Sequence, residues 1–264
     1  DAPDQFVNQR TGVSCTFRHG IELPTFLAAH RAEMQKGLTP PPEAVEAAMT
    51  FVGTGLRSFA SYTADTETDP HRLLRPANKL GISEPVRAQL VANVAALPAT
   101  DRYEFVKFRW LELFFFGVLQ KVQEQLGITD LNTGLELCWN DHPRLTNELD
   151  IAFMRSNAFW HVECKSGDWL NRDDDVATRA RNETVQTVLC QIAGRNAQFH
   201  SIGAQCAAAL THNDANTPDS FQRAAQLGLS LVGRDAIASL FRHYAAGEDQ
   251  KLAGDLRILF GWTA

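Results

Sequence analysis

Hydrophobic and polar positions follow a regular period in the second part of the chain, from about residue 101. A long run with helical spacing covers residues 103–126, and Gly127 marks its end, because glycine commonly terminates helices. Three shorter runs rich in strand-forming residues follow at 135–139, 148–154 and 159–165. The pattern predicts one helix followed by a meander of three strands.

The rest of this second part predicts further elements of both kinds. A helix over residues 176–197 precedes a strand over 203–211, and a helix–strand–helix unit follows over 221–226, 229–233 and 235–246. The order helix, three strands, helix, strand (αβββαβ), with the last unit extending the same sheet, predicts a mixed sheet flanked by helices. We therefore assign the chain to the α/β (α+β) class.

The first hundred residues have a different pattern, with short helical segments between breaks rich in Pro, Gly and Thr at 37–42 and 63–70. We interpret residues 1–100 as a helical linker or lead-in region, and residues 101–264 as the domain that carries the chemistry. Neither segment contains an internal repeat or a low-complexity tract.

One helix within the lead-in has clear N-terminal signals. Ser83, Glu84 and Pro85 are of the types that favour a helix start, and residues 86–97 continue with helical spacing. The segment is compatible with half of a helix-turn-helix in a winged-helix-like module, or with a packing helix that joins domains. Because no basic cluster lies on it, we favour the packing helix.

Composition is that of an ordinary water-soluble globular protein, with 44% hydrophobic and 21% charged residues. No stretch approaches the roughly 18–20 uninterrupted apolar residues of a membrane helix, since even 110–119 contains Glu112. The five cysteines are scattered without a CxxC pair, which argues against a disulfide framework or a zinc ribbon. We expect a cytoplasmic protein with no membrane partner.

The formal net charge of −6 argues, taken alone, against passive binding of nucleic acid, because phosphate affinity comes mainly from clustered Lys and Arg. Metal-dependent nucleases are an exception to this argument. Their carboxylates are gathered to bind divalent cations, and the bound cations reverse the charge that a substrate phosphate meets. A nuclease is therefore compatible with the composition.

Two predicted strands each display a pair of charged side chains on one face. Side chains alternate along a strand, so Glu148 and Asp150 share one face, and Glu163 and Lys165 share one face of the next strand. If the two strands are neighbours, these charges converge. For a Glu-x-Lys pair alone a solvated strand face is the expected interpretation, but here an acid precedes it on the neighbouring strand.

Glu112 lies in the strongly apolar segment 110–116 of the predicted long helix. A carboxylate in such surroundings needs a cationic partner or a metal to stay ionised. A structural salt bridge is one interpretation. We favour a role in a metal site, since this helix must pack on the sheet that displays Asp150 and Glu163.

These residues resemble the PD-(D/E)XK nuclease superfamily. Leu149-Asp150 is similar to its "PD" motif, and Glu163-Cys164-Lys165 is similar to its "(D/E)XK" motif. The core order of that superfamily is the αβββαβ order predicted above.

More narrowly, segments 110–112, 147–150 and 162–167 resemble the nuclease domain of CRISPR-associated Card/Can ancillary nucleases. Residues 223–233 look like the closing helix–strand turn of that family. The resemblance covers roughly residue 100 to the end of the chain.

The resemblance implies a metal-dependent endonuclease that hydrolyses phosphodiester bonds. The implied ligands of Mg²⁺ or Mn²⁺ are Asp150, Glu163, a backbone carbonyl at Cys164, and Glu112, since such cations prefer hard oxygen donors. Lys165 would orient the attacking water or stabilise charge on the phosphate. Asp150, Glu163, Lys165 and Glu112 are thus the expected catalytic residues.

Other polar residues have two interpretations. Arg172, Arg179, Arg181, Arg195, Gln186 and Gln191 follow Lys165 in the sequence. They could hold flanking phosphates, although a solvated helix face explains each equally well. We interpret His161, two residues before Glu163, as a structural partner without a catalytic assignment, and we assign no zinc site to Cys138 and His142.

The resemblance also implies partners. Single-stranded RNA or DNA is the expected substrate, a homodimer is the expected assembly, and type III CRISPR antiviral defence is the expected setting. Members of this family carry an N-terminal CARF domain that senses cyclic oligoadenylate, whereas residues 1–100 show only the linker-like part. We expect activation by cyclic oligoadenylate only if the full-length protein includes such a domain.

Two alternatives remain open. A restriction or repair endonuclease would apply the same chemistry to duplex DNA, although no basic recognition element is visible. A non-catalytic nucleic-acid-binding module of the same fold is the other alternative, and the retention of Asp150, Glu163 and Lys165 argues against it.

Overall fold

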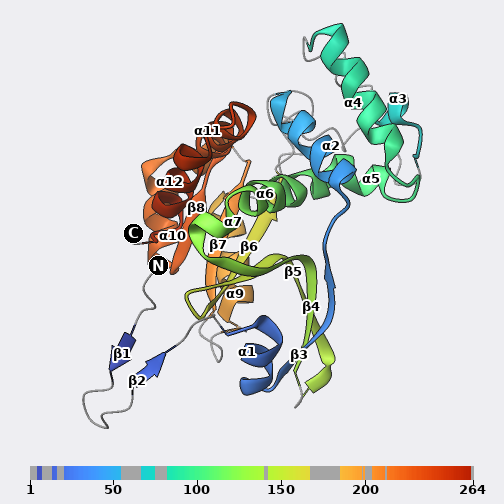
Figure 1. The fold of residues 1–264 in the computed structure, drawn as a ribbon. Helices are drawn as coiled ribbons and strands as arrows, with labels where there is room; N and C mark the ends of the chain where they lie inside the picture. Colours follow the sequence, from blue (N-terminus) through green and yellow to red (C-terminus); the bar gives the residue numbers. More distant parts are fainter. Residues whose placement is uncertain are drawn as a thin grey trace.

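The computed structural model describes residues 5–7, 14–16, 21–54, 67–74, 82–139, 142–166, 185–197, 199, 204–211 and 213–262. Two short strands, β1 (Gln5–Val7) and β2 (Ser14–Thr16), form an antiparallel pair. The remaining strands described form one mixed sheet, flanked by helices on both faces (Figure 1). The predicted fold class is confirmed.

The sheet has the order β3-β4-β5-β6-β7-β8 within the described residues. Its strands are β3 (Ala32–Leu38), β4 (Ile128–Trp139), β5 (His142–Arg155), β6 (Ala158–Lys165), β7 (Gln205–Leu210) and β8 (Leu229–Val232). Strands β3 to β6 pair antiparallel, and β6, β7 and β8 pair parallel. The predicted meander corresponds to β4, β5 and β6, with β4 and β5 longer than expected.

Edge strand β3 lies inside residues 1–100, the predicted helical lead-in region. It pairs with β4 from Ala32 opposite Trp139 to Leu38 opposite Thr133, with two register shifts. Ala32 is buried, but the strand is otherwise exposed or half-buried and shows no hydrophobic alternation. A strand without alternation carries no periodic signal, which is why the sequence did not reveal it.

The largest hydrophobic core lies between one face of the sheet and a layer of helices. Its main helices are α2 (Pro42–Gly53), α4 (Glu84–Ala96), α6 (Trp110–Lys121), α11 (Arg234–Ala245) and α12 (Asp249–Leu259). The predicted helix over 86–97 corresponds to α4, whose buried Leu90 and Val94 belong to this core. Helix α12 was not predicted, since its buried face consists of only Leu252, Ala253 and Leu256.

The opposite face of the sheet is covered by α1 (Leu23–Ala29), α9 (Val185–Asn196) and α10 (Pro218–Gln226). Strand β7 is buried on both faces: Ala207 and Ala209 belong to the first core, and Cys206, Ala208 and Leu210 pack toward α9 and α10. Two further short helices are α3 (Pro70–Leu73) and the 3₁₀ turn η5 (Asn213–Asn216). No helix in the described ranges has the length and apolar content required to cross a membrane.

The predicted long helix is observed as consecutive pieces. These are α5 (Arg102–Glu104), the π-helical turn η3 (Phe105–Arg109), α6, and α7 (Gln123–Leu126). Gly127 follows with a φ of 64°, the left-handed conformation that glycine adopts without strain. Helix α6 is buried on nearly every side because α2 covers the face that does not contact the sheet.

Close packing of α2 on α6 depends on Gly117. A Cβ atom at this position would lie 2.5 Å from Cγ1 of Val45 and 2.6 Å from Cε of Met49. We therefore expect Gly117→Val to lower the free energy of unfolding by about 2–3 kcal/mol through overpacking, measured by urea denaturation. In contrast, Gly254→Ala in α12, where an added Cβ atom would have no neighbour within 4 Å, should raise stability by about 0.5–1 kcal/mol. Equal stability of Gly117→Val and the parent chain would contradict this account of the interface.

Candidate active site

The candidate site is centred on the point where strands β5 and β6 separate. Their register runs from Arg155 opposite Ala158 to Ile151 opposite Val162. Asp150 is the residue just before Ile151 on β5, where this register ends. Its Oδ2 accepts the backbone N–H of Cys164 at 2.7 Å. The carboxylate takes over a hydrogen bond that continued strand pairing would provide, so the two strands can part here.

The parallel pairing of β6 with β7 determines which backbone groups face this opening. Thr211 donates its N–H to the carbonyl of Lys165 at 3.2 Å, so Lys165 directs its backbone toward β7. Backbone groups of successive strand residues point to opposite neighbours, so Cys164 directs its N–H and its C=O toward β5. The carbonyl of Cys164 faces the opening beside Asp150, where its interpretation as a ligand requires it.

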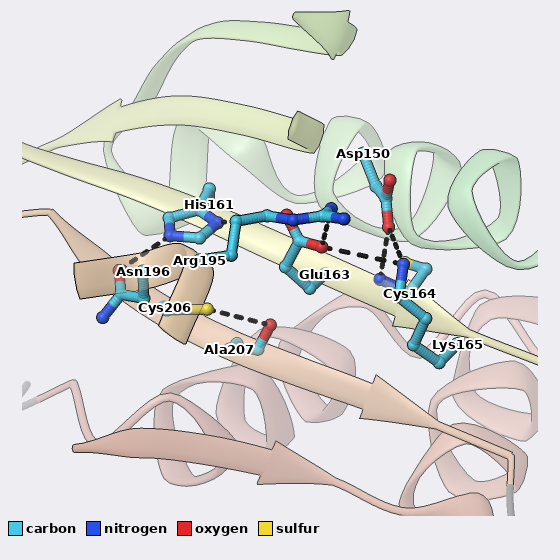
Figure 2. Close-up of polar contacts among 9 residues, drawn as sticks. All are labelled: Asp150, His161, Glu163, Cys164, Lys165, Arg195, Asn196, Cys206 and Ala207. Carbon is cyan, nitrogen blue, oxygen red and sulfur yellow. Dashed lines mark hydrogen bonds and ion pairs between the residues drawn. The ribbon is translucent and has the colours of Figure 1, made fainter. Parts of the chain in front are cut away.

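Glu163 lies in the floor of the site with a fully buried side chain. Arg195 of α9 donates from Nη1 to Oε2 of Glu163 at 2.7 Å, and Nζ of Lys165 lies 3.7 Å from the same oxygen (Figure 2). Burial raises the pKa of this carboxyl, but His161, Arg195 and Lys165 together hold the pKa below its ordinary value. Glu163 is therefore ionised although it is buried.

His161 lies beside Glu163 on the same face of β6. Its Nδ1 lies 3.8 Å from Oε1 of Glu163, too far for a hydrogen bond, and its Nε2 lies 2.9 Å from Oδ1 of Asn196. Burial disfavours the charged imidazole, but Cys206, Glu163 and Asn196 raise the pKa of His161 above its ordinary value. The raised pKa favours the charged form of the imidazole beside the carboxylate, and His161 as a structural partner of Glu163 stays a prediction.

Lys165 bridges the two acids of the strands. Its Nζ lies 3.6 Å from Oδ2 of Asp150 and 3.7 Å from Oε2 of Glu163. Burial lowers the pKa of the ammonium group, whereas the two carboxylates raise it, and the net pKa is above the ordinary value. Burial and the charge of Glu163 raise the pKa of Asp150 to about 6. The lysine therefore offsets only part of the negative charge around it.

Glu112 approaches the same opening from α6. Its side chain is half-buried, and its ion pair with Nε of Arg109 spans 3.9 Å. Burial, followed by the charge of Asp150, raises the pKa of Glu112 to about 8. A carboxyl with so high a pKa marks a place where a further cation would be stabilised.

A pocket of about 520 Å³ connects these groups to solvent. Its lining comprises Phe108, Glu112, Glu148, Asp150, Cys164, Lys165, Ser166 and Arg195. Three carboxylates face the pocket, and Glu163 does not line it because Arg195 lies over its carboxylate. The pocket therefore combines three carboxyl groups with two cationic side chains at its wall.

The donor set matches a hard divalent cation in kind. Carboxylate oxygens of Glu112, Asp150 and Glu163 and the carbonyl of Cys164 are the ligands that Mg²⁺ and Mn²⁺ prefer. Burial first, and the neighbouring carboxylates second, raise the pKa values of Glu112 and Asp150, and a bound cation would oppose both effects. Among the described residues no three His, Cys, Asp or Glu side chains are already arranged as a metal site, since Lys165 and Arg195 stand between the acids.

The structure brings some of the predicted site residues together and leaves others apart. Glu112, Asp150, Glu163, Cys164 and Lys165 are brought together at one opening. Gln186 is exposed in the first turn of α9 and is not in the pocket lining. Arg172, Arg179 and Arg181 lie outside the described residues. The pairing of Arg195 with Glu163 and the contact of Asn196 with His161 were missed, because only the packing of α9 over β6 creates them.

Comparison with known proteins gives a family match and two similar folds. The family described as "Card1-like, endonuclease domain" matches residues 99–249. The structure of Can2 from Sulfobacillus thermosulfidooxidans in complex with cyclic tetra-adenylate has a TM-score of 0.56 at 14% identity, over 97% of this chain and 67% of Can2. The crystal structure of protein VC1899 from Vibrio cholerae has a TM-score of 0.54 at 16% identity, over 94% and 66% respectively.

These structural similarities show a shared fold, and the chain spans about two thirds of the length of each of the two proteins. No curated protein matches the sequence.

The raised pKa of Glu112 predicts a pH-dependent stability in the absence of metal. A carboxyl with a pKa of about 8 in the folded chain and an ordinary value of 4.5 stabilises the fold when protonated, below about pH 4.5. That contribution is lost as the pH rises through 8. In EDTA, Glu112→Gln should melt roughly 5 °C above the parent chain at pH 9 and near it at pH 4.5. Exposed Glu124→Gln is the matched control, and an unchanged melting difference between the two pH values would contradict the assignment.

Proposed function

The chain belongs to the family of Card1-like endonuclease domains, and on this basis we propose that it is a metal-dependent endonuclease cutting single-stranded RNA, single-stranded DNA or both. The observation that carries the proposal is the convergence of Asp150, Glu163, Lys165 and Glu112 at the opening between β5 and β6. Glu112, Asp150 and Lys165 line one solvent-connected pocket, and the carboxylate of Glu163 lies beside it, 3.7 Å from Nζ of Lys165.

The proposed metal ligands are Asp150, Glu163, Glu112 and the carbonyl of Cys164, for Mg²⁺ or Mn²⁺. When bound, such a cation supplies Lewis acidity to a phosphate oxygen and lowers the pKa of a water molecule. The hydrogen bond from Cys164 keeps one oxygen of Asp150 fixed, and the residue lines the pocket. His161 and Arg195 keep Glu163 ionised and therefore competent as a ligand.

Lys165 has the electrostatic role in this proposal. Its raised pKa keeps the ammonium group charged at neutral pH, and its Nζ lies between the two strand acids at the wall of the pocket. From this position the ammonium can donate a hydrogen bond to the attacking water or to a phosphate oxygen that gains negative charge. Hydrolysis of a phosphodiester bond is the reaction that this arrangement supports.

The biological setting is a further part of the proposal. Can2, the structure in complex with cyclic tetra-adenylate, is similar in fold over 97% of this chain. We propose that this protein is an effector of CRISPR antiviral defence, acts as a homodimer in the cytoplasm, and is activated by cyclic oligoadenylate if the full-length protein carries a CARF domain.

The test is cleavage of labelled single-stranded RNA, single-stranded DNA and duplex DNA with Mn²⁺, Mg²⁺ or EDTA. We expect cleavage of a single-stranded substrate with metal and none with EDTA. Glu163→Gln and Lys165→Ala should each lower the single-turnover rate by about 100- to 1,000-fold, as expected for loss of a ligand or a charge-stabilising donor. Addition of cyclic oligoadenylate is a separate variable.

Exposed Glu124→Gln and Lys251→Ala serve as matched controls and should retain the parent rate. Cleavage that persists in EDTA, or that survives both site substitutions, would refute the proposal. Cutting confined to duplex DNA would instead favour a restriction or repair endonuclease.

A further inference from the structure

Arg195 occupies an unusual position relative to Glu163. It lies in the last turn of α9, and Figure 2 shows its side chain reaching across to the carboxylate of Glu163 on β6. The side chain of Arg195 is 42% exposed, whereas that of Glu163 is 0% exposed. The arginine thus separates a buried acid from the solvent-connected pocket.

Only one oxygen of Glu163 is directed toward the pocket side. Oε1 is buried, has no hydrogen-bond partner among the described residues, and faces buried His161. Oε2 faces Lys165 and Arg195, and both of these residues line the pocket. The oxygen that a ligand from the pocket would reach is therefore the one that Arg195 holds.

The guanidinium of Arg195 binds Oε2 of Glu163 at 2.7 Å, so a divalent cation that binds the same oxygen competes with it. A guanidinium fork binds carboxylate and phosphate with the same geometry, so Arg195 has an alternative partner in a nucleic-acid backbone. The side chain of Arg195 is partly exposed and does not belong to the buried face of α9, which consists of Val185, Val188, Leu189, Ile192 and Asn196.

We propose that Arg195 is a displaceable cap on Glu163, which competes with the metal cation for Oε2 and, once displaced, binds a phosphate of the substrate. The first half, competition between Arg195 and the cation, concerns the chain and a cation alone. The second half, binding of a substrate phosphate by Arg195, rests on the proposed nuclease function. Arg195 therefore lowers affinity for the metal and raises affinity for the nucleic acid.

The cap is tested by Mn²⁺ titration calorimetry without nucleic acid. Arg195→Ala should bind Mn²⁺ about 3- to 30-fold more tightly than the parent chain, because a charged hydrogen bond no longer competes for Glu163. Arg223→Ala is the matched control. It removes the same charge from α10, where Nη2 of Arg223 lies 3.4 Å from Sγ of Cys190, and should change the Mn²⁺ affinity less than twofold.

The Glu163→Gln variant serves as a background that tests the contact between Arg195 and Glu163. In Glu163→Gln, the additional change Arg195→Ala should leave Mn²⁺ affinity unaltered, since the acid for which Arg195 competes is gone. Thermal unfolding in EDTA checks that each variant is folded, and Arg195→Gln replaces Arg195→Ala if the latter is not. Unchanged or weaker Mn²⁺ binding by the folded Arg195 variant, or equal tightening by Arg223→Ala, would overturn the cap.

The second half is tested by fluorescence anisotropy with a labelled single-stranded oligonucleotide and saturating Ca²⁺. Arg195→Ala should weaken oligonucleotide binding about tenfold, opposite in sign to its effect on the metal. Tighter metal binding with unaltered oligonucleotide binding would refute the phosphate contact and leave the cap supported. If the parent chain binds no oligonucleotide, the proposed nuclease function fails, while the calorimetry still decides whether Arg195 caps Glu163.

Discussion

The hydrogen bond from the N–H of Cys164 to Asp150 is the interaction on which the rest of the site depends. Two antiparallel strands that continued their pairing would bury their backbone groups in one another and leave no opening. An acidic side chain that accepts one of these N–H groups satisfies the donor while it separates the strands. The opening and one of its carboxylates thus arise from a single residue, and the remaining groups are arranged around it.

Several buried charges follow from this arrangement, and each is stable only because of its neighbours. Glu163 is fully buried, yet His161 beside it on β6 and Arg195 of α9 keep it ionised. Glu112 and Asp150 lack such complete compensation, and their pKa values rise to about 8 and about 6. Isolated buried charges are costly, so this concentration of like charge is a feature of function rather than of stability.

Residue patterns predicted the parts of this structure that depend on local periodicity. Strand alternation placed Glu163 and Lys165 on one face, and helical spacing ending at Gly127 predicted the helix that carries Glu112. The contact of Arg195 with Glu163 joins residues 32 positions apart on different elements, so no local pattern indicates it. Strand β3 was missed for another reason, since its exposed side chains do not alternate.

The edge position of β3 has a consequence for where this protein can be divided. The family match begins at residue 99, whereas the sheet begins at residue 32. A fragment cut near residue 100 would leave the N–H and C=O groups of β4 unpaired along an open edge, above the buried side chains of Leu135 and Leu137. Open edges of this kind recruit strands from other molecules, and Lys36 on β3 is the sort of residue that discourages such pairing in the intact chain. Most of the sheet therefore comes from the matched domain, whereas the strand that covers its open edge comes from the part of the chain before it.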